Sequence, residues 1–251
     1  MLAPNDVLEV AVKAGEKKAN LKWWKMILLG MFAGAFIALA GVGATFANVY
    51  VGKIAGALVF PAGLAMVVVA GSELFTGNNL MAIGLFSGKY GFLKLLKNWS
   101  FVFIGNLLGA VIVAGLVAVS GVFDSIAETV IATADVKVNL GFGAAVIRGV
   151  LCNFLVCIAV WMAFASESVG GKIAAMFFPV MLFVLCGSEH SVANMFYVPA
   201  GMFMAEFNGV VGPSLAGFLV GNLLPVTIGN IIGGAIFVGG GYYLALAKRK
   251  K

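Results

Sequence analysis

The sequence predicts an all-α integral membrane protein with six transmembrane helices, of which the second and fifth are broken. The chain of 251 residues is 62% hydrophobic and only 10% charged, and its mean hydropathy is +1.09. Soluble domains carry about 25% charged residues, so this composition excludes an ordinary soluble protein. We therefore expect a single membrane domain over residues 1–251, which an internal repeat divides into two halves of inverted orientation.

Six mainly apolar stretches are each long enough to cross about 30 Å of hydrocarbon. They cover residues 26–51, 54–86, 98–123, 140–165, 173–205 and 213–247. The second and fifth are too long for one simple helix, and each contains a polar segment, so we expect a break in both. The fourth contains Arg148, whose side chain would either extend outward toward the membrane surface or pair with an acid of another subunit.

The distribution of Lys and Arg predicts which side of the membrane each connection occupies. Both ends of the chain and alternate connections are basic: Lys13, Lys17, Lys18, Lys22, Lys25, Lys89, Lys94, Lys97, Lys172, Lys248, Arg249, Lys250 and Lys251. The remaining connections hold only Lys53 and Lys137, beside Asp124, Glu128, Asp135 and Glu206. Both termini should therefore be cytoplasmic. Residues 1–25 would form an amphipathic segment, either a membrane anchor or a plug, and residues 248–251 a basic tail.

Short motifs recur between the two halves of the chain. Gly71-Ser72-Glu73 recurs as Gly187-Ser188-Glu189, and Gly105-Asn106-Leu107-Leu108 recurs as Gly221-Asn222-Leu223-Leu224, both at an offset of 116 residues. Three spans in each half mean that the second half enters the membrane from the opposite side. We therefore expect an inverted 3+3 repeat, residues 26–123 and 138–247, with a site between the halves near the bilayer centre.

His190 is the only histidine of the chain, and it lies in the second of the repeated polar segments. An ionisable group at membrane depth is costly and by default marks a functional site, although a neutral histidine bonded to backbone is the alternative. Broken helices also expose N-terminal N–H groups that suit an anion. We expect Glu73 and Glu189 to have structural roles, because a carboxylate on an anion pathway would repel the anion.

Three motifs resemble the signatures of the formate/nitrite transporter family. They are Glu189-His190-Ser191-Val192-Ala193-Asn194-Met195, Gly71-Ser72-Glu73-Leu74-Phe75-Thr76-Gly77-Asn78 and Leu151-Cys152-Asn153-Phe154-Leu155-Val156-Cys157-Ile158-Ala159-Val160-Trp161. The resemblance covers essentially the whole chain. It implies an aquaporin-like bundle of six spans that assembles as a homopentamer, in which each protomer has its own pore.

The resemblance also implies roles for individual residues along that pore. The central histidine would be His190, and Thr76 would be its hydroxyl partner across the pore. The cytoplasmic constriction would be formed by Leu64, Leu74 and Phe75, and the outer constriction by Phe60, Val156 and Phe183. Lys137 would draw anions into the outer vestibule. The residues expected to support the two polar loops are Glu73, Glu189, Ser188, Ser191, Asn153 and Asn194.

These observations together predict a channel or transporter for a small monovalent anion of a weak acid, formate or nitrite in the first place. Coupling to protons through His190 is an open option, and a hydrosulfide or lactate channel of the same family is the alternative. A water or glycerol channel would carry paired Asn-Pro-Ala loops, and the sequence has none. An enzyme would carry a catalytic motif such as Gly-x-Ser-x-Gly or His-Glu-x-x-His, and neither occurs.

The expected partners are the transported anion, the lipid bilayer and further copies of the chain. The basic balance is explained by membrane topology, so no nucleic-acid partner is expected. Cys152, Cys157 and Cys186 fit no metal or haem spacing and should be packing residues. We therefore expect neither a cofactor nor a metal site, and we place the protein in the plasma membrane of a prokaryote.

Overall fold

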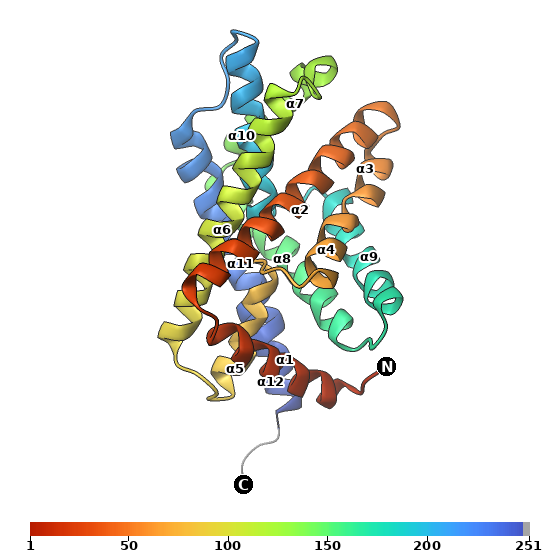
Figure 1. Ribbon diagram of the computed structural model, residues 1–251, viewed down its shortest axis with the longest axis vertical. Helices are drawn as coiled ribbons and strands as arrows, with labels where there is room; N and C mark the ends of the chain where they lie inside the picture. Colours follow the sequence, from red (N-terminus) through yellow and green to blue (C-terminus); the bar gives the residue numbers. More distant parts are fainter. Residues whose placement is uncertain (248–251) are drawn as a thin grey trace.

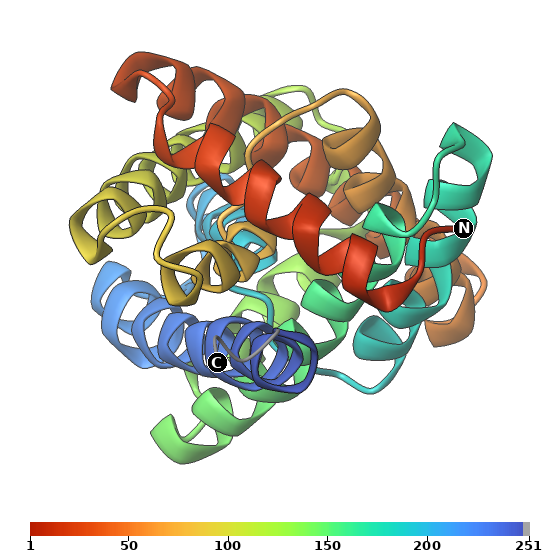
Figure 2. The ribbon, with the colours of Figure 1, turned by 90° about the horizontal axis from the view of Figure 1, so that it is seen from below.

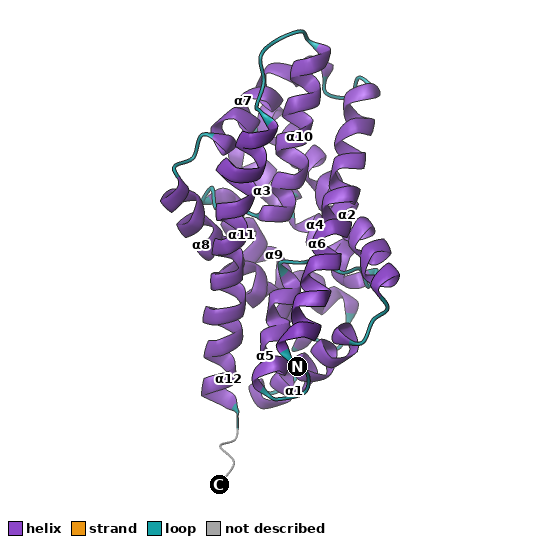
Figure 3. Cartoon of the chain, turned by 90° about the vertical axis from the view of Figure 1, so that its left-hand side faces the viewer, coloured by secondary structure: helices purple, strands orange, loops and turns teal. Residues whose placement is uncertain are grey.

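The computed structural model describes residues 1–247, in which every regular element is a helix (Figures 1 and 3). The basic tail expected over residues 248–251 lies outside this described part. In chain order the elements are α1 (Pro4–Ala19), α2 (Trp23–Tyr50), α3 (Lys53–Val59), α4 (Pro61–Val69), a 3₁₀ turn (Gly77–Met81), α5 (Ala82–Phe86), α6 (Phe92–Val119), a 3₁₀ turn (Asp124–Ile126), α7 (Ala127–Val138), α8 (Phe142–Phe164), α9 (Val169–Leu185), α10 (Ser191–Phe207), a π-helical segment (Gly217–Leu223), α11 (Leu224–Ile231), a second π-helical segment (Ile232–Gly240) and α12 (Gly241–Leu246).

Four helices are long and apolar enough to cross a membrane, namely α2, α6, α8 and the continuous helix Gly217–Leu246 that includes α11 and α12. The other two apolar stretches are interrupted. One stops after α4, at a loop over residues 70–76, and the other stops after α9, at a loop over residues 186–190. Breaks are therefore present in the two stretches that are too long for a single helix.

Glycine ends the preceding helix in the same way at both breaks. Gly71 and Gly187 have φ angles of +76° and +71°, a conformation that glycine adopts at little cost. The N–H of Ser72 donates to the carbonyl of Val67 at 2.9 Å, and Ser188 makes the equivalent bond at 3.0 Å. This is the six-to-one hydrogen bond of a Schellman C-cap. The repeated Gly-Ser pair therefore stops each half-helix before its polar loop.

Small residues allow the spanning helices to pack closely in two pairs. A Cβ on Gly109 of α6 would lie 2.0 Å from the carbonyl oxygen of Met31 in α2. A Cβ on Gly229 of α11 would lie 2.1 Å from the carbonyl oxygen of Val146 in α8. Small residues are typical of the points where membrane helices cross. In lipid the hydrophobic effect does not drive helices together, so close backbone packing holds them instead.

Helix α1 lies across the end of the bundle at which α12 also ends (Figures 1 and 2). We call this end the terminal face and the opposite end the far face. Val7, Leu8 and Ala11 of α1 belong to one apolar cluster with Trp161 of α8 and Val238 near the C-terminus. Burial of these side chains fixes α1 to the bundle as an integral part of the fold.

Three details differ from the sequence analysis. Helix α6 begins at Phe92 and so includes Lys94 and Lys97, because long basic side chains let a helix continue beyond its apolar part. The connection expected between the third and fourth spans contains α7, an additional helix. Cys186 is exposed, contrary to the expected packing role, because it lies where α9 ends.

Candidate functional site

The two broken segments meet in the interior of the molecule through Thr76 and His190. The hydroxyl oxygen of Thr76 lies 2.9 Å from Nε2 of His190, and the two side chains are 0% and 3% exposed. The ring of Phe183 stacks on the imidazole, with 5.7 Å between the ring centroids. Residues 114 positions apart in the chain are thus joined at a buried polar contact between the halves.

The backbone around His190 decides which imidazole nitrogen carries the hydrogen. His190 is the N-cap residue of α10, and its Nδ1 accepts a hydrogen bond from the N–H of Ala193 at 3.0 Å. An amide N–H only donates, so Nδ1 has no hydrogen and the neutral ring carries it on Nε2. Nε2 therefore donates to Thr76, whose own hydroxyl hydrogen remains available to another acceptor.

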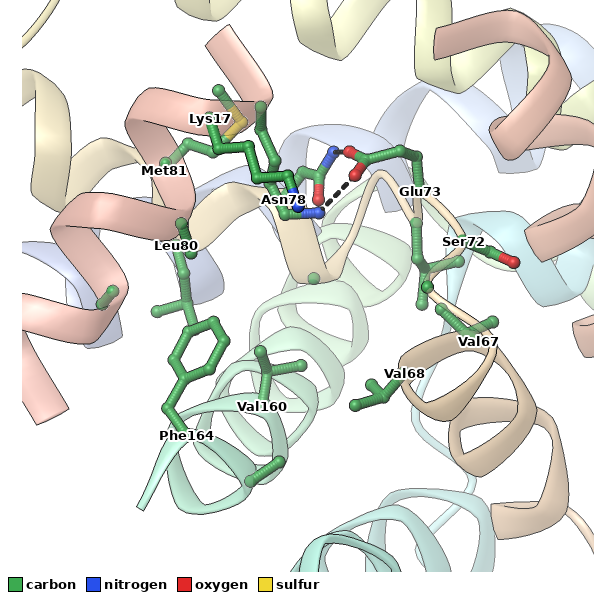
Figure 4. A pocket seen from close by; sticks show the side chains of 18 of the residues that line it. Lys17, Val67, Val68, Ser72, Glu73, Asn78, Leu80, Met81, Val160 and Phe164 are labelled. Atoms are coloured by element: carbon green, nitrogen blue, oxygen red, sulfur yellow. Dashed lines mark hydrogen bonds and ion pairs between the residues drawn. The ribbon is translucent and has the colours of Figure 1, made fainter. Parts of the chain in front are cut away.

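A partly buried ion pair holds the carboxylate of the first polar loop. Lys18 of α1 lies 2.7 Å from Oε1 of Glu73, and the amide of Asn78 donates to Oε2 at 2.7 Å (Figure 4). The same amide also donates to Asn98 of α6 at 2.9 Å, and Asn98 donates to the carbonyl of Lys18. Glu73 is 5% exposed. Its charge is therefore neutralised inside the protomer.

The second polar loop has a matching arrangement. Lys137 of α7 lies 2.9 Å and 3.1 Å from the two carboxylate oxygens of Glu189. The amide of Asn194 donates to Glu189 at 2.6 Å and to Asn222 at 2.7 Å, and Asn222 donates to the carbonyl of Lys137. Nζ of Lys137 also lies 5.5 Å from the ring centroid of Tyr197. The structure thus places Lys137 in an ion pair, whereas the family resemblance implies a charge that draws anions from solution.

Two further asparagines hold the backbone of the loops. Asn106 of α6 accepts from the N–H of Phe75 at 2.9 Å and donates to the carbonyl of Glu73 at 2.9 Å. Asn230 of α11 accepts from the N–H of Ser191 at 2.9 Å and donates to the carbonyl of Glu189 at 3.0 Å. Each asparagine thereby satisfies backbone groups that the interrupted helices leave free.

These contacts correct the repeat register for the last span of each half. Asn98 and Asn106 correspond in their hydrogen bonds to Asn222 and Asn230, an offset of 124 residues instead of 116. The offset changes because α10 (Ser191–Phe207) has 17 residues, whereas the corresponding 3₁₀ turn and α5 cover only residues 77–86, and the connection that follows is also longer, residues 208–214 against 87–91. The match between Gly105-Asn106 and Gly221-Asn222 is therefore a coincidence of sequence, and Gly229-Asn230 is the structural counterpart.

Helix α8 holds the backbone of Thr76 through contacts to its carbonyl oxygen. The amide of Asn153 donates to the carbonyl of Thr76 at 3.3 Å, to Asn79 at 2.8 Å and to the carbonyl of Asn230 at 2.7 Å. The thiol of Cys157 also approaches the Thr76 carbonyl at 3.4 Å. Within residues 1–247, three fully buried side-chain oxygens near these loops have no hydrogen-bond partner: Asn153 Oδ1, Ser191 Oγ and Asn194 Oδ1.

Aromatic and aliphatic side chains surround this polar centre. Phe60 meets Phe183 edge to face with 5.8 Å between centroids, and Val156 is 1% exposed. Phe75 packs against the rings of Trp99 and Phe103. The six residues expected to form the two constrictions are all buried: Leu64, Leu74, Phe75, Phe60, Val156 and Phe183.

A cavity of about 350 Å³ lies at the terminal face, between α1, α4, α8 and α9. Leu64 and Leu74 are among its lining residues, as are the paired Glu73 and Asn78 (Figure 4). Lys17, Lys18 and Lys172 also line it. We call this cavity the terminal vestibule. Helix α1 forms part of its wall, so in this structure the amphipathic segment borders the vestibule rather than filling it.

Comparisons with known proteins decide the family. The family model described as "Formate/nitrite transporter" matches residues 5–244. The chain belongs to the formate/nitrite transporter family. It is 40% identical to "Uncharacterized transporter YrhG" of Bacillus subtilis, over 99% of this chain and 95% of that protein. It is 37% identical to "Formate channel FocA" of Escherichia coli, over 97% of this chain and 94% of that protein.

Two solved structures of the formate/nitrite transporter fold are similar to this chain. A "Pentameric formate channel with formate bound" has a TM-score of 0.78 and 33% identity, and the match covers 90% of this chain and 98% of that one. An "FNT family ion channel" has a TM-score of 0.83 and 30% identity, covering 96% and 98% of the two chains. The predicted resemblance is thereby confirmed, and the chain is a membrane transport protein and not an enzyme.

Sequence reasoning missed several residues that build the loops of this transporter. They are Lys18, Asn79, Asn98, Asn106, Asn222 and Asn230, together with the thiol of Cys157. The available signal was the spacing of asparagines within apolar stretches, because a buried amide in a membrane helix needs partners. Asn98 and Asn106 stand eight positions apart, as do Asn222 and Asn230.

Proposed function

We propose that this protein conducts a small monovalent anion of a weak acid, formate or nitrite, across the membrane through each protomer. The observation that carries the proposal is the buried contact between Thr76 and His190, where two interrupted helices meet. The route would lead from the terminal vestibule past Leu64, Leu74 and Phe75 to this contact, and then past Phe60, Val156 and Phe183 to the far face. The similarity to formate channels supports formate as substrate.

The bundle would consist of six spans in two inverted repeats. The support is the correspondence of hydrogen bonds around Glu73 and Glu189, each with one lysine and two asparagines. Because Lys18 and Lys137 correspond, α1 and α7 would each belong to a repeat. The repeats would then begin before the boundaries of 26–123 and 138–247 expected from apolar sequence alone.

The neutral tautomer of His190 suggests how the anion passes. A bare charge in a dry constriction costs of the order of several kcal/mol, so the permeant species would cross most readily with its charge neutralised by a proton. Protonating Nδ1 of His190 would break the cap bond to Ala193, which is worth about 1 kcal/mol. His190 would therefore serve as a fixed Nε2–H donor that polarises Thr76, and the proton would accompany the anion from solution.

Transport measurements test both parts of this proposal. Uptake of formate, nitrite, hydrosulfide and lactate into proteoliposomes, side by side at two pH values, should be fastest for formate or nitrite and faster at the lower pH. Preference for hydrosulfide or lactate would favour the alternative channel, and absence of uptake for all four would refute the proposal. His190→Asn retains an N–H donor that does not titrate, so it should keep the pH dependence. If that dependence disappears, His190 itself carries the proton.

The oligomer would be a homopentamer in the plasma membrane of a prokaryote, with both termini cytoplasmic. A pentameric structural neighbour supports the oligomer, and the lysine-rich terminal face supports the orientation. Arg148 is exposed on the protomer although its carbonyl accepts from the N–H of Glu189, which suits a contact with another subunit. Native mass spectrometry should give a mass of five chains. Labelling of K13C and K53C, each in a background in which the exposed Cys186 is replaced by serine, should show that only the second is accessible from outside.

A further inference from the structure

The terminal vestibule contains two positive charges that no carboxylate of the described residues neutralises. Lys17 and Lys172 both line the cavity, and neither forms an ion pair within residues 1–247. The third lysine, Lys18, is bound to Glu73 at 2.7 Å. Glu73 is the one acid among the residues of the described part that line the cavity. The net charge of the lining residues is therefore positive.

The two lysines come from different walls. Lys17 lies in the last turn of α1, and Figure 4 shows its side chain at the same cavity as Glu73 and Asn78. Lys172 lies in the first turn of α9, where the positive end of the helix dipole adds to the positive potential. Between them the wall is apolar, with Val67, Val68, Val160 and Phe164. Cationic groups over an apolar wall suit a small monovalent carboxylate better than a cation or a polyanion.

The far face offers no comparable surplus. Lys137 is 15% exposed and is bound to both carboxylate oxygens of Glu189. Three acids in the segments at that face are exposed, namely Asp124, Glu128 and Glu206, against one exposed lysine there, Lys53. An approaching anion therefore meets a positive potential at the terminal face and a more negative one at the far face. Surface potentials of this kind change the local concentration of a charged ligand about 10-fold or more.

We propose that Lys17 and Lys172 form an anion-capture site, which makes the channel half-saturate at a lower anion concentration from the terminal face than from the far face. The inference rests on the proposed function and adds that the anion concentration needed for half-saturation differs between the two sides of the membrane. With the termini in the cytoplasm, the captured ligand would be a monocarboxylate leaving the cell. In a passive channel the ratio of maximal rate to half-saturation concentration is equal in both directions, so the lower half-saturation concentration goes with a lower maximal rate.

Oriented proteoliposomes test this asymmetry. Formate flux is measured from each face at low and at high salt for the wild type, K17M, K172M and the double variant, with K13M as a control of equal charge change outside the vestibule. The double variant should raise the half-saturation concentration from the terminal face by about three- to tenfold at low salt. The difference should vanish at high salt because the charges are screened. K17R and K172R should behave like the wild type, which separates charge from packing.

The outcomes distinguish this proposal from the proposed function. Formate flux with equal half-saturation from both faces, or a double variant indistinguishable from wild type, overturns the capture site and leaves the anion channel standing. Loss of the asymmetry in K13M as well shows a diffuse surface potential and also overturns the site. A wild-type protein that transports none of the four anions overturns both proposals.

Discussion

Replacing Lys137 by methionine should destabilise this transporter far more than it alters anion affinity. Methionine keeps most of the length of the lysine side chain but removes its charge. Lys137 and Glu189 are 15% and 6% exposed, and their charged atoms are 2.9 Å and 3.1 Å apart. K137M would therefore leave a buried carboxylate with only the amide donors of Asn194 and Asn222.

The size of this effect follows from the burial of the pair. Breaking a buried ion pair by removing one partner costs about 3–5 kcal/mol, chiefly because the other charge stays buried. For a chain of this length, about 1 kcal/mol shifts the melting temperature by roughly 2–4 °C, so K137M should lower it by about 6–20 °C. Adding E189Q removes the isolated charge, and the double variant K137M/E189Q should regain at least half of that loss.

Thermal unfolding of the detergent-solubilised wild type, K137M and K137M/E189Q measures these changes in melting temperature, and formate flux is measured in parallel. The equivalent variant K18M should cost less, because Lys18 is more exposed, at 25%, than Lys137 at 15%. If K137M melts like the wild type while its half-saturation concentration from the far face rises, Lys137 is a free vestibule charge. The ion pair in the structure would then have no energetic importance.

Three further predictions follow from the contacts. Asn230→Ala removes three hydrogen bonds to buried backbone groups and should cost about 3 kcal/mol or more in thermal unfolding; an unchanged melting temperature would contradict its support of the loop. Gly229→Ala should cost about 1–3 kcal/mol by overpacking, whereas Gly143→Ala, with open space around it, should be neutral or stabilising. Thr76→Val keeps the shape but leaves the buried Nε2–H of His190 without its acceptor, so flux should fall and stability should drop by about 1–3 kcal/mol; wild-type flux would show that the hydroxyl has no role.

The positions of the two breaks could be predicted from the sequence because several independent signals coincide there. Each stretch exceeds the length of one membrane-spanning helix, and each contains Gly-Ser-Glu, which supplies a glycine for the helix end and polar groups for the loop. The contact between Thr76 and His190 came from family motifs, not from the residues themselves. Spacing alone does not show that side chains more than a hundred residues apart face each other.

Helix α7 and the register of the second half could not be predicted in the same way. The segment Ala127–Val138 is mixed in polarity, and three of its residues carry charge, so its sequence resembles an exposed connection. It is helical because Val130 and Ala134 are buried against the bundle, an interaction that propensity does not reveal. The offset of 116 residues predicted for the last span of each half was wrong. A four-residue match in an apolar sequence carries less information than the eight-residue spacing of two buried asparagines.

The pairing of the buried carboxylates explains how the proposed anion pathway can run close to Glu73 and Glu189. A lone buried carboxylate would repel a passing anion strongly, since the Coulomb energy of two unit charges at 4 Å is about 4 kcal/mol at an effective dielectric constant of 20. Each carboxylate is instead matched by one lysine within about 3 Å, and the field of such a pair declines much faster with distance. The charges at the two loops therefore hold the interrupted helices in place without opposing transport. Lys17 and Lys172 differ from the loop lysines: both line the terminal vestibule and neither forms an ion pair within residues 1–247, so their charge can act on an anion in solution.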